Sequence, residues 1–382
     1  MMKGWKYQKL GDVISITMGQ SPSSNTYNED GDGLPFFQGN ADFDKEHPKV
    51  RVYCNAPVRI ADEEDVLISV RAPIGAINIA DRECCIGRGL AALRGNKLIS
   101  NRFLYRFLYA SKAKLIAQGT GSTFKSIGKE ALSSLMIPMV PISEQKRIVA
   151  ELDLLTDVID KQKQQLKELD TLAQSIFYDM FGDLVENEKG WEVKALKDSV
   201  IEMFLGPFGS ALKTDCYVDK EKAFCMVYEQ KHAIKKTMDV ETHYIDEEKF
   251  NSLRRFEVHS GDFIMSCRGT IGEIYRIPQG ASMGIIHPSL MKIRIREDIY
   301  APTFFQWLLS RIIKNENTNG NCVQMAITAK ELGKRTPIVP PLAFQESFAD
   351  KIEAIEQQKE NINQSIAETQ KLFDYTMDKY FG

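Results

Sequence analysis

The residues with the chemistry to cut or modify a substrate are few and poorly arranged in this 382-residue chain. Asp215, Glu229 and Lys231 can be written as a nuclease-like Asp…Glu-x-Lys series, but this spacing arises easily by chance when 26% of the residues are charged. No Gly-x-Gly-x-x-Gly loop and no Asn/Asp-Pro-Pro-aromatic run occurs. The five histidines have no metal-ligand spacing, standing at positions 47, 232, 243, 259 and 287. We expect no catalytic site, metal or cofactor; a self-contained nuclease is the alternative.

Side chains suited to reading a nucleic acid are more numerous. Arg71 and Arg268 each follow a strand-like run and precede a glycine turn, where a guanidinium can bind phosphate or guanine. A structural ion pair is an equal alternative for both. The other candidates are polar or basic residues of loop-like segments: Gln20, Ser21, Ser23, Ser24, Tyr27, Gln38, Lys125, Ser210, Lys213, Tyr228, Gln230, Lys231 and Gln324. An ordinary solvated loop is the alternative for each of them.

The chain contains two tandem copies of one sequence unit. Lys3-Gly4-Trp5 returns as Lys189-Gly190-Trp191, and the run from Asp65 to Arg71 returns from Asp262 to Arg268. Met180-Phe181-Gly182 likewise returns as Tyr380-Phe381-Gly382. Because Arg71 and Arg268 are shared, we expect a structural or backbone-binding role for them. Residues that read bases should lie where the two units differ.

Each unit predicts a mixed α/β block followed by a long helix. The first part of each block, Thr17–Asn40 and Met203–Lys236, has no clear period and is predicted as loop. Apolar and β-branched runs then predict three strands, and an amphipathic helix follows. The predicted strands are 65–71, 75–80 and 89–93 in the first block and 262–268, 272–277 and 289–295 in the second, with helices 101–111 and 302–314.

The segment Ser143–Gly182 is predicted to form one long helix with a heptad stripe. Apolar residues such as Ile148, Leu152 and Leu155 recur at steps of four and three. Such a helix cannot bury its own stripe, and the last forty residues of the chain supply a similar one. Two like units pack about a pseudo-two-fold axis, so we predict an antiparallel coiled coil.

The same symmetry predicts the register of the coiled coil. Ile148 should lie near Tyr380, and Leu155 near Phe373. Lys359 should carry its ammonium outward from the seam. The second stripe is weaker because threonines stand in it at 369 and 376. We hypothesise that a neighbouring subunit covers part of this stripe.

The composition is that of an ordinary globular protein. The seven cysteines are scattered without a Cys-x-x-Cys pair, which favours a reduced, cytoplasmic protein. No apolar run is long enough to cross a membrane, and the start lacks a signal core. Residues 143–190 and 343–382 carry net charges of −5 and −4, so the remaining blocks carry +6 out of a total of −3. This split favours a polyanion partner for the blocks; ordinary variation in surface charge is the alternative.

Several of these motifs together resemble the specificity (S) subunit of type I restriction–modification systems. The resemblance is carried by Lys3-Gly4-Trp5 with Leu10-Gly11-Asp12, by Pro141–Gln145 with Arg147-Ile148, by Met180–Asp183 and by their second copies. It implies that each block is a target recognition domain reading one half of a bipartite site in double-stranded DNA. It also implies that the helices form a spacer and bind two methyltransferase (M) subunits, with restriction (R) subunits joining a larger complex.

The resemblance implies an α+β fold with four segments and no catalysis. The segments are target recognition domain 1 (1–142), a central spacer helix (143–186), target recognition domain 2 (187–341) and a C-terminal spacer helix (342–382). Gln145, Arg147 and Gln345 are predicted to contact partner subunits, unequally because Glu346-Ser347 replaces Lys146-Arg147. The alternative is a coiled-coil adaptor that joins proteins without binding DNA.

Overall fold

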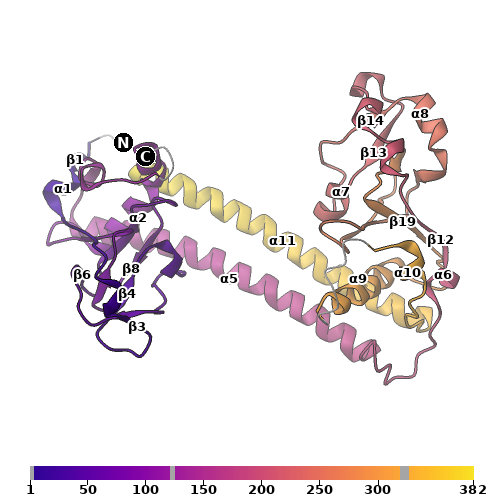
Figure 1. The fold of residues 1–382 in the computed structure, drawn as a ribbon, viewed down its shortest axis with the longest axis horizontal. Coiled ribbons are helices and arrows are strands. Elements are labelled where there is room, and N and C mark those ends of the chain that lie inside the picture. Colours follow the sequence, from indigo (N-terminus) through magenta and orange to yellow (C-terminus); the bar gives the residue numbers. More distant parts are fainter. Residues whose placement is uncertain (1–3, 121–124, 319–326) are drawn as a thin grey trace. The chain divides into compact units, whose positions relative to one another are not determined.

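The computed structural model describes residues 4–120, 125–318 and 327–382. The chain forms two compact units, shown in Figure 1: unit 1 comprises Met1–Gln165 and Ile362–Gly382, and unit 2 comprises Leu166–Asn361. Each unit holds one mixed α/β domain and parts of two 40-residue helices, α5 (Ile142–Phe181) and α11 (Leu342–Phe381). Within the described ranges, none of the helices has the length and apolar character needed to cross a membrane.

The domain of unit 1 contains two sheets. The first is antiparallel, in the order β2 (Ser15–Met18), β10 (Leu90–Arg94), β7 (Val66–Ser69), β8 (Ile77–Ile79). The second has the order β3 (Tyr27–Asn28), β5 (Tyr53–Cys54), β4 (Leu34–Phe37), β9 (Cys84–Ile86), β6 (Ile60–Ala61), and its pair β4–β9 is parallel.

The first sheet of unit 1 is the middle layer of the domain. Val66 and Ile68 of β7 pack with helix α2 (Asn101–Ala110) and with residues of α5 and α11. Leu67, between them, packs with Phe37 and Ile86 of the second sheet. Successive side chains of a strand point to opposite faces, so β7 is buried on both.

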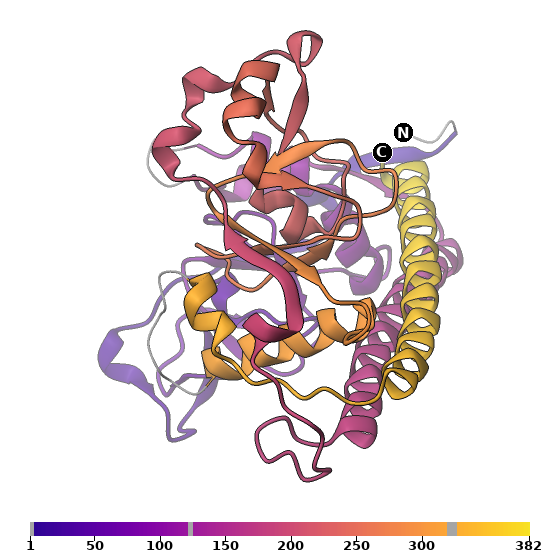
Figure 2. The same ribbon diagram turned by 90° about the vertical axis from the view of Figure 1, so that its right-hand side faces the viewer.

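The domain of unit 2, in the foreground of Figure 2, repeats this arrangement. Its first sheet has the order β12 (Val200–Leu205), β19 (Leu290–Ile295), β16 (Phe263–Ser266), β17 (Ile274–Arg276). Its second has the order β14 (Tyr244–Ile245), β13 (Cys225–Tyr228), β18 (Gly284–Ile286), β15 (Glu257–Val258), again with one parallel pair, β13–β18. Helix α9 (Pro302–Thr318) takes the place of α2.

Short elements complete both domains. Strand β1 (Lys6–Lys9) pairs with β11 (Met136–Met139) beside the start of α5. The short helices are α1 (Leu10–Val13), α3 (Lys112–Ala117), α4 (Lys129–Ser133), α6 (Leu196–Ser199), α7 (Gln230–Lys235), α8 (Glu247–Ser252) and α10 (Ala329–Gly333). Single 3-10 turns lie at 24–26, 40–42, 209–211, 214–216, 220–222 and 254–256.

The strands predicted after each loop-like segment are confirmed as β7, β8 and β10 and as β16, β17 and β19. The prediction of loop for Thr17–Asn40 and Met203–Lys236 is wrong, because these segments contain β3, β4, β13 and α7. The reason is that β4 and β13 are only four residues long and largely buried on both faces. Such a strand shows no alternation of apolar and polar residues.

Helices α5 and α11 run antiparallel within each unit. In unit 1, Ile148 and Tyr380 belong to one buried cluster, and Gln162 donates to Ser365 Oγ at 2.6 Å. In unit 2, Phe177 packs edge-on against Phe348, with ring centroids 5.5 Å apart. Figure 1 shows α11 (yellow) lying alongside α5 (magenta). The antiparallel direction predicted from the repeat is therefore found in each unit.

The weaker stripe of α11 is covered by the chain itself at one of its two threonines. Thr376 is buried within unit 1, and Thr369 is half-buried with its hydroxyl bonded to the Ser365 carbonyl. The chain itself therefore covers the stripe at Thr376, and coverage of another part of the stripe by a neighbouring subunit stays a prediction. Lys359 carries its ammonium out of the seam as predicted, and pairs with Asp170 at 2.9 Å.

A buried glutamine fixes the start of each long helix. Gln145 Nε2 donates to the carbonyls of Leu98 and Val140 at 2.6 and 2.9 Å, and Oε1 accepts from Ser100 N–H at 2.9 Å. Gln345 makes the same three bonds, to the carbonyls of Ile299 and Pro340 and from Ala301 N–H. Both side chains are 0% exposed. The predicted partner contact of Gln145 and Gln345 is therefore corrected to a structural role.

We expect Gln145→Ala to destabilise unit 1 by about 3 kcal/mol or more, because each of three buried backbone groups loses its hydrogen bond at about 1–3 kcal/mol each. Denaturant unfolding followed by fluorescence checks this value. Lys146→Ala is the matched control, since Lys146 is the exposed neighbour on the same turn. Equal stability of the two variants would contradict the structural role.

Candidate nucleic-acid interface

The candidate site of unit 1 is the rim of its domain where the ends of several strands meet. The loop Gly87–Gly89, between β9 and β10, lies at its centre. Gly19 N–H, after β2, donates to Leu90 O at 2.9 Å, and Gly87 N–H donates to Phe37 O of β4 at 2.8 Å. Val70 N–H, after β7, donates to Gly89 O at 2.9 Å. The residues that follow these strands therefore emerge side by side, and we call this rim edge 1.

The backbones at edge 1 approach one another so closely that side chains would not fit between them. A Cβ on Gly19 would lie 2.2 Å from the Gly87 carbonyl oxygen. A Cβ on Gly89 would lie 2.2 Å from the Gln38 carbonyl oxygen. Glycine is required at both positions, and the close contact fixes the directions of the neighbouring polar side chains.

Arg71 projects from a turn that is held by a serine hydroxyl. Ser69 Oγ donates to Pro73 O at 2.6 Å and accepts from Ala76 N–H at 3.1 Å. The backbone of Arg71 forms a bridge with Ser126, which places Lys125 beside it. Both Arg71 and Lys125 are exposed. Edge 1 therefore carries exposed cationic residues on two adjacent backbone segments.

Unit 2 builds the same turn. Ser266 Oγ accepts from Glu273 N–H at 2.9 Å, as Ser69 does from Ala76. Gly272 has φ +89° where Gly75 has φ +81°. Arg268 is exposed at the end of the equivalent strand. Arg71 and Arg268 therefore occupy equivalent positions in the two units, as the repeat predicts.

The arginines of the unit 1 domain fall into two groups. Five of the eight arginines in residues 4–120 form ion pairs with carboxylates: Arg51, Arg82, Arg94, Arg102 and Arg106. The others are Arg59, Arg71 and Arg88, all exposed, and their guanidinium groups have no hydrogen bond or ion pair with any residue that the structure describes. This excludes the structural ion pair as an explanation for Arg71.

The three unpaired arginines lie at the same rim. Arg88 is in the central loop, Arg71 follows Val70, and the Arg59 carbonyl accepts from Ile86 N–H at 2.9 Å. Sequence reasoning missed Arg59 and Arg88. The Gly-Arg-Gly sequence at 87–89 was the only local signal, because an arginine between two glycines has few side chains nearby. Unpaired guanidinium groups on fixed backbone are suited to phosphates and guanine edges.

Edge 2, the corresponding rim of unit 2, has the same frame with fewer cations. Gly206 N–H donates to Leu290 O, His287 N–H to Tyr228 O, and Cys267 N–H to Ser289 O, each at 2.9 Å. Arg268 is exposed, and its guanidinium has no hydrogen bond or ion pair within the described ranges. In the strand pairing, Pro288 and Phe256 take the places of Arg88 and Arg59.

His287 adds no cation to edge 2. Its Nδ1 accepts from Ser289 N–H at 3.2 Å and lies 2.8 Å from Ser289 Oγ. Burial lowers the pKa of His287 below its ordinary value, so the ring is neutral at physiological pH. Edge 2 is therefore less positive than edge 1.

The polar residues predicted in unit 1 lie at or near edge 1. Gln20, Ser23, Ser24 and Gln38 are exposed, and Gln20 N–H donates to Ile86 O at 3.0 Å. Ser21 Oγ is half-buried and accepts from Arg88 N–H at 3.3 Å, so it supports the central loop. Tyr27 is also half-buried, and its hydroxyl donates to Pro22 O at 2.9 Å.

The residues predicted in unit 2 have more varied roles. Ser210 and Lys213 are exposed. Tyr228 is 0% exposed and its hydroxyl donates to Ser282 O, so the prediction that Tyr228 contacts a base is wrong. Gln230 Nε2 donates to Arg268 O at 2.6 Å, and Lys231 pairs with Glu229 at 3.0 Å. Gln324 lies outside the described residues.

The nuclease-like series does not form a metal site. Glu229 is bonded to Lys231, His243 and Thr242. Burial acts to raise its pKa, but these hydrogen bonds hold the pKa of Glu229 below its ordinary value. Among the described residues, no group of histidine, cysteine, aspartate and glutamate could hold a metal ion.

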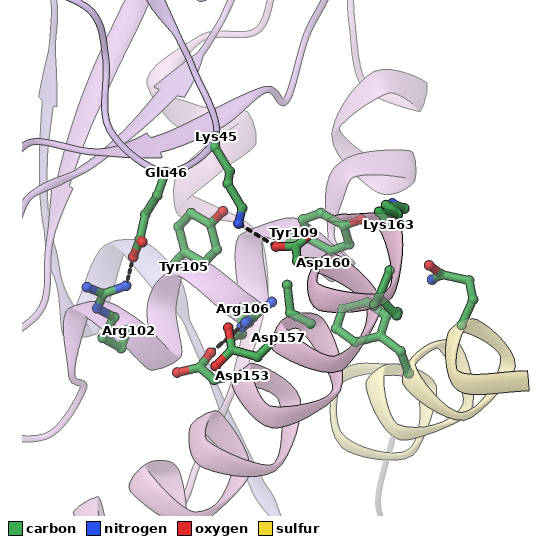
Figure 3. A pocket seen from close by; sticks show the side chains of 14 residues that line it. Lys45, Glu46, Arg102, Tyr105, Arg106, Tyr109, Asp153, Asp157, Asp160 and Lys163 are labelled. Atoms are coloured by element: carbon green, nitrogen blue, oxygen red, sulfur yellow. Dashed lines mark hydrogen bonds and ion pairs between the residues drawn. The ribbon is translucent and has the colours of Figure 1, made fainter. Parts of the chain in front are cut away.

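A cavity of about 700 Å³ in unit 1, shown in Figure 3, lies between the domain and α5. Lys45 pairs with Asp160 at 2.6 Å, Glu46 with Arg102, and Arg106 with Asp153. Three of the cations that line the cavity are thus paired with carboxylates of the same unit, and the pairs of Lys45 and Arg106 join the domain to α5. Edge 1 is the better place for a polyanion.

Part of the chain is similar in sequence to known proteins. Residues 2–171 match the family described as type I restriction modification DNA specificity domain. The putative type I restriction enzyme MjaX specificity subunit of Methanocaldococcus jannaschii is 41% identical over 175 residues, which are 45% of this chain and 41% of that protein. A second protein of that organism, the MjaIX specificity subunit, is matched over 51% of its length. The chain therefore spans about half or less of these relatives.

One solved structure has a similar fold over nearly the full length of this chain. The S subunit of a type I restriction–modification system from M. genitalium has a TM-score of 0.58, is 15% identical, and covers 99% of this chain and 96% of its own. The EcoKI specificity subunit of Escherichia coli strain K12 is 21% identical over 78% of this chain and 68% of that protein. The mixed α/β fold described above is similar to that of an S subunit.

We expect acidification to destabilise unit 2 through His287. Its pKa in the folded chain lies below the ordinary value of 6.5, so the unfolded chain takes up a proton as the pH falls through 6.5 while the folded chain does not. Stability should therefore fall with pH from 6.5 downward. His287→Asn keeps an acceptor for Ser289 N–H without the titration, so its melting temperature should depend less on pH. Identical pH curves would disprove the assignment.

Proposed function

We propose that this chain is the DNA sequence-recognition subunit of a type I restriction complex. The proposal is supported by the match of residues 2–171 to the DNA specificity domain of such systems and by the 41% identity over 175 residues to a putative specificity subunit. The domain of each unit reads one half of a bipartite site in double-stranded DNA. The observation that carries this proposal is the arrangement of arginines at edge 1. Three exposed guanidinium groups stand there without a partner in the described structure, while the other arginines of the domain are paired.

Helices α5 and α11 form an antiparallel coiled-coil spacer in this proposal. Target recognition domain 1 comprises 1–142, the central helix 143–186, target recognition domain 2 187–341, and the C-terminal helix 342–382. Residues 143–190 and 343–382 are acidic, which suits contact with protein better than contact with phosphate.

The partners are two methyltransferase subunits, with restriction subunits in the larger complex, and the catalytic groups belong to them. Arg147 is exposed near the start of α5, where it pairs with Glu144 at 2.7 Å. It remains in the proposed partner surface, whereas the buried Gln145 and Gln345 do not.

The first test separates DNA recognition from the adaptor alternative. The chain mixed with its methyltransferase partner should retard a duplex that carries the complete site, with affinity falling as salt rises. Association of the proteins that is independent of salt, with no retarded DNA, would favour the adaptor. The site itself comes from methylation-sensitive sequencing of the host genome with and without the gene.

Arg71→Ala and Arg88→Ala should each weaken binding of that duplex and lower the slope of log K against log salt by about 1, because each removes one phosphate-neutralising charge. Where the lost contact is to guanine, binding should weaken by about five- to a hundredfold and specificity at that position should relax. Fluorescence anisotropy at several salt concentrations measures both quantities. Arg82→Ala is the control, because Arg82 is exposed but paired with Asp81. Equal effects of all three substitutions would contradict the role of edge 1.

Exchange of residues 1–142 for those of a related chain should change one half of the methylated sequence and leave the other half and the gap unchanged. The physical reason is that edge 1 is built entirely from residues of this block. Sequencing of methylated sites reports the result. A change in both halves would contradict independent reading by the two domains.

A further inference from the structure

Edge 2 carries an exposed aromatic ring where edge 1 carries a serine. Gly206 occupies the position of Gly19, because both donate their N–H to the first residue of the central strand, Leu290 or Leu90, at 2.9 Å. Counting onward from these glycines, Phe208 corresponds to Ser21. The side chain of Phe208 is 88% exposed, the largest value for a large apolar residue in the described ranges.

The backbone that carries Phe208 is held firmly. A Cβ on Gly206 would lie 2.3 Å from the His287 carbonyl oxygen, so the strand ends in close contact with the loop after β18. Pro207 is buried and fixes its own φ angle. The Phe208 carbonyl accepts from Ala211 N–H at 2.8 Å and begins a 3-10 turn. The ring is thus directed into solvent from a defined position.

The surroundings of Phe208 are those of a nucleic-acid surface. Arg268 follows Cys267, whose N–H donates to Ser289 O next to Leu290, so Arg268 and Phe208 leave the two strands that flank β19, at the same rim. Ser210 and Lys213 are exposed just beyond the ring. An exposed phenylalanine forgoes the hydrophobic stabilisation that burial would provide. Edge 2 also lacks the second and third arginines of edge 1 and needs another source of affinity.

We propose that Phe208 is an apolar wedge that inserts between base pairs of the half-site read by unit 2 and partly unstacks them. This inference rests on the proposed function. An apolar side chain placed between base steps partly unstacks them and lets the bent duplex contact more protein. Pyrimidine–purine steps unstack most easily, so the half-site read by unit 2 contains one at the point of insertion. The half-site read by edge 1 is bound mainly through charge and guanine contacts.

The test uses the full chain in complex with its methyltransferase partner and duplexes with 2-aminopurine at successive positions of each half-site. Binding of the wild-type complex should raise the 2-aminopurine fluorescence at one position in the half-site assigned to unit 2 by domain exchange. Phe208→Ala should abolish this rise and weaken binding by about five- to a hundredfold, as expected for loss of one base–aromatic contact. The salt slope should stay unchanged, because the ring carries no charge. Phe208→Leu should retain part of the rise.

Ile201→Ala is the matched control, because Ile201 is 64% exposed at the other end of the same strand, β12. It should leave both readouts unchanged. If the Phe208→Ala complex kept the full fluorescence change and the full affinity, the proposed insertion of Phe208 would be wrong, while the proposed function would stand. Failure of that variant to join the methyltransferase, seen by gel filtration, would assign Phe208 to a protein contact and also overturn the insertion. Absence of any DNA binding by the wild-type complex would instead overturn the proposed function.

Discussion

The structure depends on hydrogen bonds that a buried glutamine makes at the start of each long helix. Gln145 and Gln345 each bind two carbonyls and one N–H of the surrounding backbone, and no solvent could replace these bonds. The chain leaves a strand, turns at a proline and enters the helix in one fixed direction. In unit 1 the ion pairs of Lys45 and Arg106 with α5 add to this constraint. A domain tied to its helix in this way can present its rim in one orientation.

The two units share the backbone hydrogen bonds of the rim and differ in the side chains that the rim carries. The hydrogen bonds of Gly19, Val70 and Gly87 recur at Gly206, Cys267 and His287 with nearly the same lengths. Side chains at the rim do not recur, apart from Arg71 and Arg268. Backbone geometry can therefore be kept while recognition changes, since the central loop tolerates Gly-Arg-Gly in one unit and His-Pro-Ser in the other.

Much of the fold could be predicted from the sequence, because its signals are local or repeated. The heptad stripe and the repeat together predicted the antiparallel pairing of α5 with α11, and apolar runs predicted the six central strands. The burial of Gln145 could not be predicted, since glutamine in a charged first turn has the pattern of an exposed residue. Tyr228 was predicted to be accessible to DNA but is buried, because the sequence does not show which way a tyrosine at the end of a short strand faces. The ion pairs of Arg94, Arg102 and Arg106 join residues 29, 56 and 47 positions apart. The unpaired Arg59 and Arg88 could therefore be distinguished from these arginines only in three dimensions.

The distribution of charge explains how a chain with a net charge of −3 can bind a polyanion. Attraction to phosphate depends on local unpaired charge, because exposed charges separated by more than a Debye length of about 10 Å are largely screened from one another. On the proposed function, edge 1 offers three unpaired arginines to DNA, whereas edge 2 offers one unpaired arginine and one aromatic ring, and each edge has one exposed lysine nearby, Lys125 or Lys213. Rising salt weakens the first half-site more than the second. As salt rises, the complex should therefore lose affinity for the half-site of unit 1 first. Discrimination between DNA sequences at high salt then depends on the half-site that Phe208 contacts.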